Sequence, residues 1–195
     1  MKIKKGLPSL AGFTLVELLI VMAVLGVLAV VVLIAINPVQ QLARTRDTGR
    51  SSTVAQLGHA IEAFAAARNG IYPTDQGAAA VCTGATSPIN TDDAWIGDCL
   101  VATGEVQVLP STVGRPTGGG AVCDTAASAT ENDWCYDGNS TSAVIFTRAE
   151  ANANIAQCTS PALAYFVYST AAGRGGLWCG TAAALVPPLT TGFVQ

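Results

Sequence analysis

The stretch AGFTLVELLIVMAVLGVLAVVVLIAIN, residues 11–37, decides the fold of this chain of 195 residues. From Phe13 to Ile36, only Thr14 and Glu17 interrupt a continuous run of apolar residues and glycine. As an α-helix, this run extends about 36 Å at 1.5 Å per residue, which exceeds a bilayer core of roughly 30 Å. Residues 13–36 are therefore predicted to be a membrane-embedded helix, and the carboxylate inside it needs an explanation.

The charges are few and unevenly placed. Only 12% of the residues are charged, whereas soluble globular domains have about a quarter. All three lysines precede the apolar run, and the rest of the chain sets seven arginines against thirteen acidic residues. Because no basic stripe appears there, the composition does not support a nucleic-acid site.

The cysteines indicate the compartment. Six cysteines, an even number, follow the apolar run. They include no CxxC pair, and the whole chain has one histidine. Zinc sites use close Cys/His pairs, so neither a metal nor another cofactor is expected. Up to three disulfides and an extracytoplasmic domain are predicted, with buried free thiols as the alternative. The connectivity stays open among Cys82, Cys99, Cys123, Cys135, Cys158 and Cys179.

The leader, residues 1–12, is short and basic and ends at Gly12. A secretory signal peptide is cut after its apolar region. Here the candidate junction between Gly12 and Phe13 comes before that region, so cleavage leaves the apolar helix on the mature protein. The basic residues flanking the helix tie at three on each side, so the cysteines favour a cytoplasmic N-terminus.

A second helical segment follows. Pro38 lacks an N–H and is predicted to kink or loosen the helix. Apolar residues then recur at spacings of three, four and three, which predicts one buried stripe: Val54, Leu57, Ile61 and Phe64. The whole helical region is expected to run, with a break, from residue 13 to about residue 69.

The polar face and the end of this helix are also predicted. Asp47 lies three residues from both Arg44 and Arg50, which places it on the wetter side of the helix. Gly70 is expected near the left-handed position that ends the helix, because Pro73 follows closely.

The remaining periodic segments predict a sheet. Short runs rich in aromatic and β-branched residues are DWCYDG, SAVIFTRA, LAYFVYST and LWCGTA, starting at residues 133, 142, 163 and 177, with AAGRGG at 171–176 as turn material. Residues 74–130 are predicted to be an irregular connecting region restrained by cysteines. The fold class is α+β: a long N-terminal helix packed on a small antiparallel sheet, in a disulfide-rich domain.

The sequence GFTLVELLIV, residues 12–21, resembles the processing and assembly motif of type IV pilins and of their relatives, the pseudopilins. A basic leader, a glycine, a phenylalanine and then a glutamate at the fifth mature position carry the resemblance. It extends loosely through NGIYPT at residues 69–74, and beyond residue 80 no specific pattern of the family is identified.

The resemblance implies roles for three residues. Gly12 ends the leader and a prepilin peptidase cuts after it, Phe13 becomes an N-methylated terminus, and Glu17 acts in assembly. A charge inside a bilayer costs on the order of 2.5–3.5 kcal/mol, so Glu17 needs a partner. The new amine of Phe13, on the same or a neighbouring subunit, would supply it, and the pair would set the axial offset between subunits.

Two further positions are compared with the family. Many pilins have a glycine and a later proline that bracket a segment which unwinds on assembly. Gly26 matches the glycine, but Ile34 stands where the proline often falls and Pro38 comes one turn later. The resemblance therefore implies an unwound segment that is shifted or longer here.

Other motifs have plainer interpretations. His59 is expected to be a solvated or packed helix residue, and the Arg44, Arg46 and Arg50 cluster a solvated helix face or headgroup contact. Asp92, Asp93 and Asp98 form an acidic loop without EF-hand spacing, so calcium is only the weaker alternative. NST at 139–141 is a glycosylation-type sequon.

The predicted organisation is a leader at 1–12, a transmembrane and assembly helix at 13–36, an amphipathic continuation at 37–70 and an extracytoplasmic globular domain at 71–195. The predicted function is a non-enzymatic subunit of a type IV pilus-like filament, first in the inner membrane and then in an extracellular pilus. By resemblance, its partners are further copies of itself, a prepilin peptidase, an assembly ATPase and a platform protein.

Two alternatives remain. YPTDQG at residues 72–77 is similar to a stretch of major secretion pseudopilins, which favours a periplasmic pseudopilus of a type II secretion or competence apparatus. From another class, a membrane-anchored adhesin or enzyme would use the apolar run as a plain signal anchor.

Overall fold

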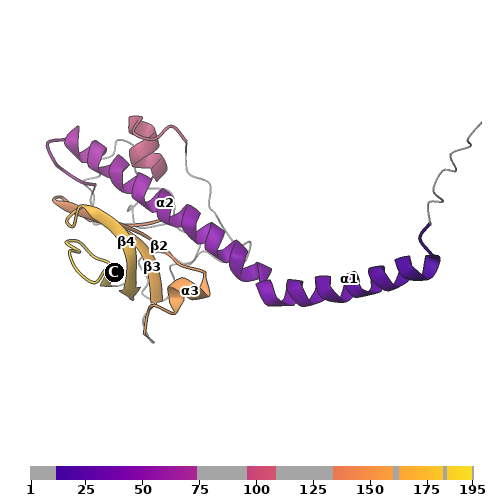
Figure 1. Ribbon diagram of the computed structural model, residues 1–195. Coiled ribbons are helices and arrows are strands. Elements are labelled where there is room, and N and C mark those ends of the chain that lie inside the picture. The colour runs from indigo at the N-terminus through magenta and orange to yellow at the C-terminus, as the bar shows by residue number, and fades with distance from the viewer. Residues whose placement is uncertain (1–11, 74–95, 109–133, 160–162, 182–183, 195) are drawn as a thin grey trace, which may run out of the picture. The chain divides into compact units, whose positions relative to one another are not determined.

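The computed structural model describes residues 12–73, 96–108, 134–159, 163–181 and 184–194 (Figure 1). The chain forms two compact units, Met1–Val39 and Gln40–Gln195. Its elements are α1 (Leu15–Ile36), α2 (Pro38–Ala66), η1 (Ile96–Val101), β1 (Cys135–Asn139), β2 (Ser142–Arg148), α3 (Asn152–Ile155), β3 (Leu163–Ser169) and β4 (Arg174–Gly180). They give the α+β, pilin-like fold that the sequence predicts.

The break between α1 and α2 lies at Asn37. This residue ends α1 in the left-handed region, with φ 45° and ψ 75°. The α conformation is disfavoured immediately before proline, and asparagine tolerates positive φ better than most residues. Pro38 then occupies the first position of α2, where its missing N–H is not needed.

The end of α2 comes slightly earlier than predicted. The helix ends at Ala66, and the N–H of Gly70 donates to the carbonyl of Ala65 at 2.8 Å. Asn69 and Gly70 both have positive φ, at 56° and 80°. The chain therefore leaves the helix through two successive left-handed residues, as the RNG sequence indicates.

The sheet is a four-stranded antiparallel meander in the order β1-β2-β3-β4 (Figure 1). Ser140 and Thr141 link β1 to β2, and the β3–β4 hairpin closes around Ser169 opposite Arg174. Arg174 and the two glycines after it therefore belong to β4, although the sequence predicted turn material there. Gly175 lies opposite Tyr168, whose side chain covers the space beside it.

One face of the sheet packs against α2. The predicted stripe of Val54, Leu57, Ile61 and Phe64 is buried, with at most 2% of any of these residues exposed. It forms one core with alternate residues of the strands: Tyr136, Ala143, Ile145, Ala164, Phe166 and Tyr168. The burial of this single stripe fixes which side of α2 faces the sheet.

The opposite face has a second core that the sequence analysis did not assign. Val144, Phe146, Tyr165 and Val167 lie on this face, and Leu185 and Leu189 from the C-terminal segment cover it. A β-bridge joins Trp178 to Phe193, and the N–H of Val194 donates to the carbonyl of Leu177 at 2.8 Å. Both faces of the sheet are thus buried, which explains the near-continuous burial along β2 and β3.

Part of the predicted connecting region also belongs to the core. Within residues 74–130, the π-helix η1 places Cys99 and Leu100 at 0% exposure in the core on the α2 side. The prediction of irregular structure was therefore wrong for this segment. Its six residues show too few turns for a helical period to be read from the sequence.

Candidate processing and assembly site

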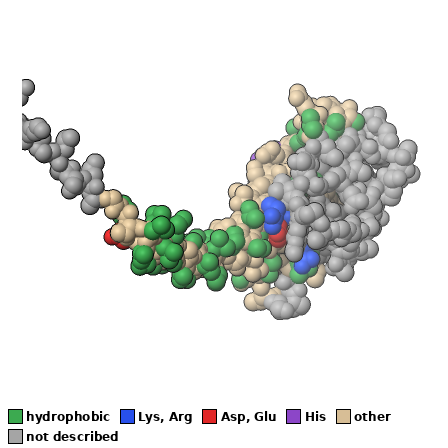
Figure 2. Space-filling view, turned by 90° about the vertical axis from the view of Figure 1, so that its right-hand side faces the viewer, with side chains coloured by type: hydrophobic (Ala, Val, Ile, Leu, Met, Phe, Trp, Pro, Cys, Tyr) green, Lys and Arg blue, Asp and Glu red, His purple; other side chains and the backbone are tan. Residues whose placement is uncertain are grey.

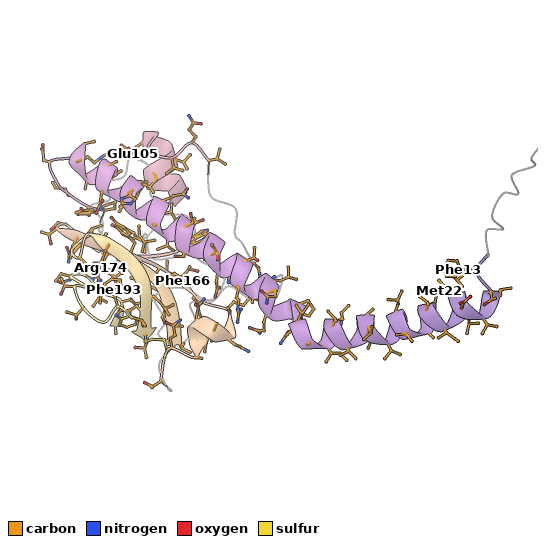
Figure 3. All side chains as sticks on the ribbon, viewed as in Figure 1. Phe13, Met22, Glu105, Phe166, Arg174 and Phe193 are labelled. Atoms are coloured by element: carbon orange, nitrogen blue, oxygen red, sulfur yellow. A yellow bond between two sulfur atoms is a disulfide. The ribbon has the colours of Figure 1, made fainter. Side chains whose placement is uncertain are left out.

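The junction between Gly12 and Phe13 lies outside the helix. Both residues precede α1 and are exposed, with 88% of Phe13 accessible (Figure 3). Among the described atoms, none lies within 4 Å of the position that a Cβ on Gly12 would take. The peptide bond between them is therefore accessible and not part of a hydrogen-bonded helical turn.

A capping box begins α1. Thr14 is the N-cap with φ −80° and ψ 150°, and its Oγ1 accepts from the N–H of Glu17 at 3.2 Å. In return, Glu17 Oε2 accepts from the N–H of Thr14 at 3.2 Å and from its hydroxyl at 2.9 Å. Two backbone donors at the helix start are satisfied reciprocally, and the carboxylate lies at the positive end of the helix dipole.

The capping box gives Glu17 a local partner that the sequence analysis missed. Thr14 and Glu17 have the T-x-x-E spacing of a capping box, which is the sequence signal for this contact. The box turns the carboxylate toward the chain's N-terminus, where its Oε2 meets the N–H of Thr14, the residue after Phe13.

Apart from Glu17 in its first turn, α1 has an apolar surface on every side. None of its residues is buried, and it is the single helix in the described ranges that is long and apolar enough to cross a membrane. Hydrophobic side chains cover most of the part of it that faces the viewer in Figure 2. Gly26 lies in this uninterrupted helix, with no described atom within 4 Å of its Cβ position.

A polar cluster ties α2 to the loop after β2. Asp47 was predicted on the wetter side of the helix, yet 2% of it is exposed, and 1% of Arg50. Asp47 Oδ2 accepts from the N–H of Ala151 at 2.9 Å and from the amide of Asn154 at 2.7 Å. Its Oδ1 accepts from the N–H of Glu150 at 3.0 Å. The expectation of a solvated face was wrong here, because the loop covers it and supplies the donors.

Two arginines complete this cluster, which we call the polar anchor: Arg46, Asp47, Arg50, Glu150 and Asn154. Arg50 donates to Asp47 at 2.7 Å and to Glu150 at 3.1 Å. Arg46 forms a second ion pair with Glu150, in which its Nε donates at 2.8 Å. Hydrogen bonding from Arg46 outweighs burial and holds the pKa of Glu150 below its usual value. Arg44 alone of the predicted arginine cluster is exposed, as expected.

His59 lies beside a second polar contact between α2 and the sheet. The hydroxyl of Tyr168 donates to Glu62 at 3.0 Å and lies 3.3 Å from His59 Nδ1. Burial, followed by the hydrogen bond with Glu62, raises the pKa of Tyr168 to about 12. The His59 side chain is 71% exposed.

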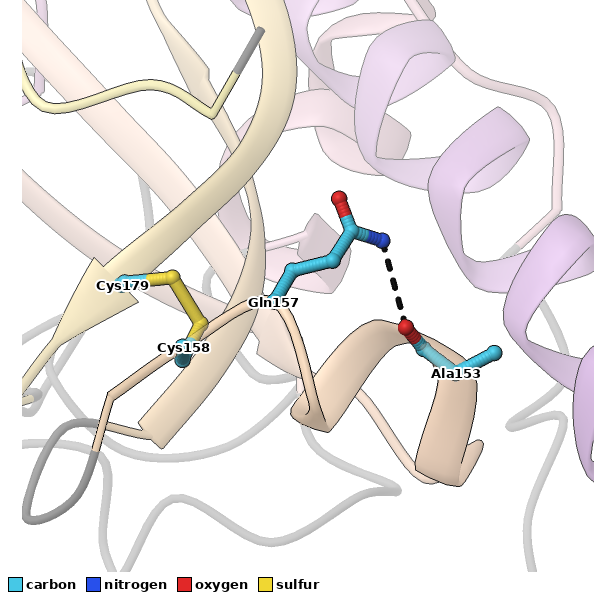
Figure 4. The surroundings of a disulfide bond; sticks show 4 residues. All are labelled: Ala153, Gln157, Cys158 and Cys179. Atoms are coloured by element: carbon cyan, nitrogen blue, oxygen red, sulfur yellow. Dashed lines mark hydrogen bonds between the residues drawn. A yellow bond between two sulfur atoms is a disulfide. The ribbon is translucent and has the colours of Figure 1, made fainter.

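Disulfides are present in the globular unit. Cys158 and Cys179 are bonded, which joins the segment after α3 to β4 (Figure 4). In the same figure, the amide of Gln157 donates to the carbonyl of Ala153 at 3.3 Å, which closes the turn before Cys158. Cys99 and Cys135 are also disulfide-bonded. Cys82 and Cys123 lie outside the described residues.

The three acidic residues predicted to form a loop fall at the edge of a described range. Asp92 and Asp93 lie outside the described residues, and so does the side chain of Asp98. Within the described ranges, the structure has no cluster of three or more His, Cys, Asp or Glu side chains able to hold a metal ion.

Comparison with known proteins bears on the N-terminal region. Residues 10–33 match the family model described as the prokaryotic N-terminal methylation motif. The chain carries a type IV prepilin signal. The prepilin signal includes the exposed Gly12–Phe13 junction, the capping box and all of α1 except its last turn. Neither the curated proteins nor the solved structures give a match.

Proposed function

We propose that this chain is the precursor of a type IV pilus subunit, cut after Gly12, methylated on Phe13 and assembled through its N-terminal helix. The observation that carries the proposal is the methylation motif at residues 10–33, which ends inside a helix able to span a membrane. The exposed junction before the N-cap suits a peptidase that needs an extended substrate. No catalytic chemistry is proposed for the chain itself.

The proposed division of the chain follows from this function. Residues 1–12 are the leader, 13–36 the transmembrane and assembly helix, 37–70 its amphipathic continuation and 71–195 the extracytoplasmic domain. A prepilin peptidase, an assembly ATPase and a platform protein are the proposed partners, in addition to further copies of the chain. The precursor resides in the inner membrane until its helix enters a filament.

Glu17 is proposed to pair with the amine that cleavage creates on Phe13. In the precursor, its carboxylate is already held at the N-terminus of α1 by Thr14. Cleavage adds a positive charge one residue away from that contact. In an apolar filament core, an unpaired carboxylate is costly, so an arrangement of subunits that pairs the two charges is favoured over one that does not. Gly26 and Pro38 are proposed to allow local unwinding during assembly.

The N-terminus of the mature protein tests the proposal. We expect the membrane or filament form to begin at an N-methylated Phe13 in intact-mass and peptide mass spectrometry. Retention of Met1 in the functional form would overturn the proposal and favour the plain signal anchor of an adhesin or enzyme.

Three variants separate the two roles of Glu17, which are the capping box with Thr14 and the proposed pairing with the amine of Phe13. Glu17→Gln keeps a capping-box residue but removes the charge, whereas Thr14→Ala removes the cap and keeps the charge. We expect Glu17→Gln and Glu17→Ala to insert into the membrane normally and to form few filaments, because the amine loses its partner. Filaments from Glu17→Gln at the wild-type level would show that capping alone is the role of Glu17.

The pseudopilin is the second candidate, favoured by the YPTDQG stretch at residues 72–77. A pseudopilus is a short periplasmic fibre, whereas a pilus extends from the cell. Mechanical shearing of cells separates them, because abundant sheared filaments containing this chain support the pilus. Methylated subunits that remain with the cell envelope support the pseudopilus.

A further inference from the structure

We propose that Asn139 is the acceptor of an N-linked glycan, attached on the extracytoplasmic side of the membrane. The proposal rests on the proposed function for the export of residues 71–195. It concerns the turn between β1 and β2, which belongs to the globular unit and has no part in processing or helix assembly.

Asn139 begins the N-x-S/T sequence Asn139-Ser140-Thr141, and no other asparagine of the chain has a serine or threonine two positions later. Such a sequon alone is common. Its placement is more specific, because it occupies the tight turn in which Asn139 pairs with Ser142 across the hairpin. Ser140 and Thr141 are exposed and Asn139 is half-exposed, so the acceptor lies at the surface.

The side chain of Asn139 has a fixed orientation. Its Oδ1 accepts from the N–H of Thr141 at 2.9 Å, from the Thr141 hydroxyl at 2.8 Å and from the N–H of Ser142 at 2.9 Å. Because backbone N–H groups only donate, they assign the oxygen to this side of the amide. The nitrogen Nδ2 is therefore on the opposite side, and it has no hydrogen-bond partner in the described parts of the chain.

These contacts suit the chemistry of glycosyl transfer to an amide. An amide nitrogen is a weak nucleophile because its lone pair is delocalised onto the oxygen. Hydrogen bonds donated to Oδ1 stabilise negative charge on that oxygen, so they make the N–H groups of Nδ2 more acidic. The threonine hydroxyl of the sequon is one of these donors, at 2.8 Å. The turn thus presents an oxygen that is held and a nitrogen that is free to react.

The co-reactant is a glycan activated as a lipid diphosphate, used by a membrane transferase. Nδ2 forms a bond to the anomeric carbon of the first sugar, and the bond from that carbon to the diphosphate oxygen breaks. The lipid diphosphate leaves with the electron pair, and a base of the transferase takes one proton from Nδ2.

The test is peptide mass spectrometry of the full chain purified from its own cells. We expect the peptide that contains Asn139 to carry an added mass of sugar units, and enzymatic cleavage of the glycan–amide bond to leave aspartate at this position. Asn139→Asp removes the nucleophile but keeps carboxylate oxygens that accept the same turn hydrogen bonds. It should therefore fold and carry no glycan. Thr141→Ala should also lose the glycan, and Thr141→Ser should retain it.

Two results would overturn the proposal. An unmodified Asn139 peptide from protein whose Phe13 is methylated would show that the chain is processed but not glycosylated here. Sugar retained in Asn139→Asp and lost in Ser140→Ala or Thr141→Ala would assign an O-linked site instead. Failure of the prepilin proposal is separately visible, because the N-terminal peptide then lacks both cleavage and methylation.

Discussion

At the residue scale, two carboxylates are held by backbone donors in opposite surroundings. Glu17 accepts from the N–H of Thr14 in an exposed first turn, whereas Asp47 is buried and accepts from the N–H groups of Glu150 and Ala151. Breaking a buried charged pair by removing one partner costs about 3–5 kcal/mol, because the other charge remains without compensation. Removal of Asp47 should therefore strongly weaken the contact between α2 and the loop after β2.

A glycine of α2 gives the first stability prediction. A Cβ on Gly58 would overlap the ring of Tyr168 on β3. Gly58→Ala should gain less than about 1 kcal/mol in helix propensity but lose about 1–3 kcal/mol through overpacking. We expect a net loss of stability in chemical denaturation of the detergent-solubilised chain, followed by tryptophan fluorescence.

Gly26→Ala is the matched control for this prediction. Gly26 is also a helical glycine, but no described atom lies within 4 Å of its Cβ position. If Gly58→Ala unfolds at the same denaturant concentration as the wild type, the prediction that α2 packs too closely on Tyr168 to admit a methyl group is wrong.

At the element scale, α2 makes two kinds of contact along its length. Its first half meets the rest of the globular unit through the polar anchor, and the N–H of Asn152 also donates to Gln40 at 3.1 Å. Its second half contributes the apolar stripe that ends at Phe64. The two halves therefore respond to different conditions, since ionic contacts weaken with salt and acid whereas apolar burial is strengthened by excluded salts.

The Cys158–Cys179 disulfide should stabilise the sheet edge. The bond closes a loop with a sequence separation of 21 residues and joins β4 to the segment that follows α3. A loop of this size contributes about 3 kcal/mol by restricting the unfolded chain. We expect the double variant Cys158→Ala and Cys179→Ala to unfold at lower denaturant concentration.

Reduction of the wild-type protein supplies the comparison for this prediction. Mild reductant should lower the stability of the wild type more than that of the double variant, because the variant has already lost this bond. Equal sensitivity of the two proteins would assign the stabilisation to the other disulfides.

The elements that sequence alone predicts are those whose signal is local. The apolar run from Phe13, the stripe that includes Ile61 and the β-branched strands follow from composition and period. The burial of Asp47 does not, because its partners lie more than 100 residues away along the chain. The second core was missed for the same reason, since Leu185 and Leu189 carry no periodic pattern.

At the scale of the whole molecule, stability should fall in acid through Glu150. Its pKa is lowered in the folded chain, mainly by the hydrogen bond from Arg46. The carboxylate therefore contributes its full stabilisation above the unfolded pKa of about 4.3 and loses it as the pH falls through the lower folded value. We expect the free energy of unfolding to decrease in that window.

Glu150→Gln isolates this contribution. The variant should be less stable than the wild type at neutral pH, and the difference should shrink as the pH falls through the lowered folded pKa of Glu150, below which the wild-type carboxylate is also neutral. A difference that stays constant across this range would assign the effect to packing and not to charge.

The order of the contacts along α2 has a mechanical consequence. In a filament of the kind proposed, tension enters the globular unit through the chain at Pro38, so it reaches Gln40, Arg46 and Asp47 before the apolar stripe. The polar contacts join the start of α2 to one loop, whereas the stripe packs along the second half of the helix against the sheet. The start of α2 would then yield first under load and re-form on release, which would let a pilus lengthen before its subunits unfold.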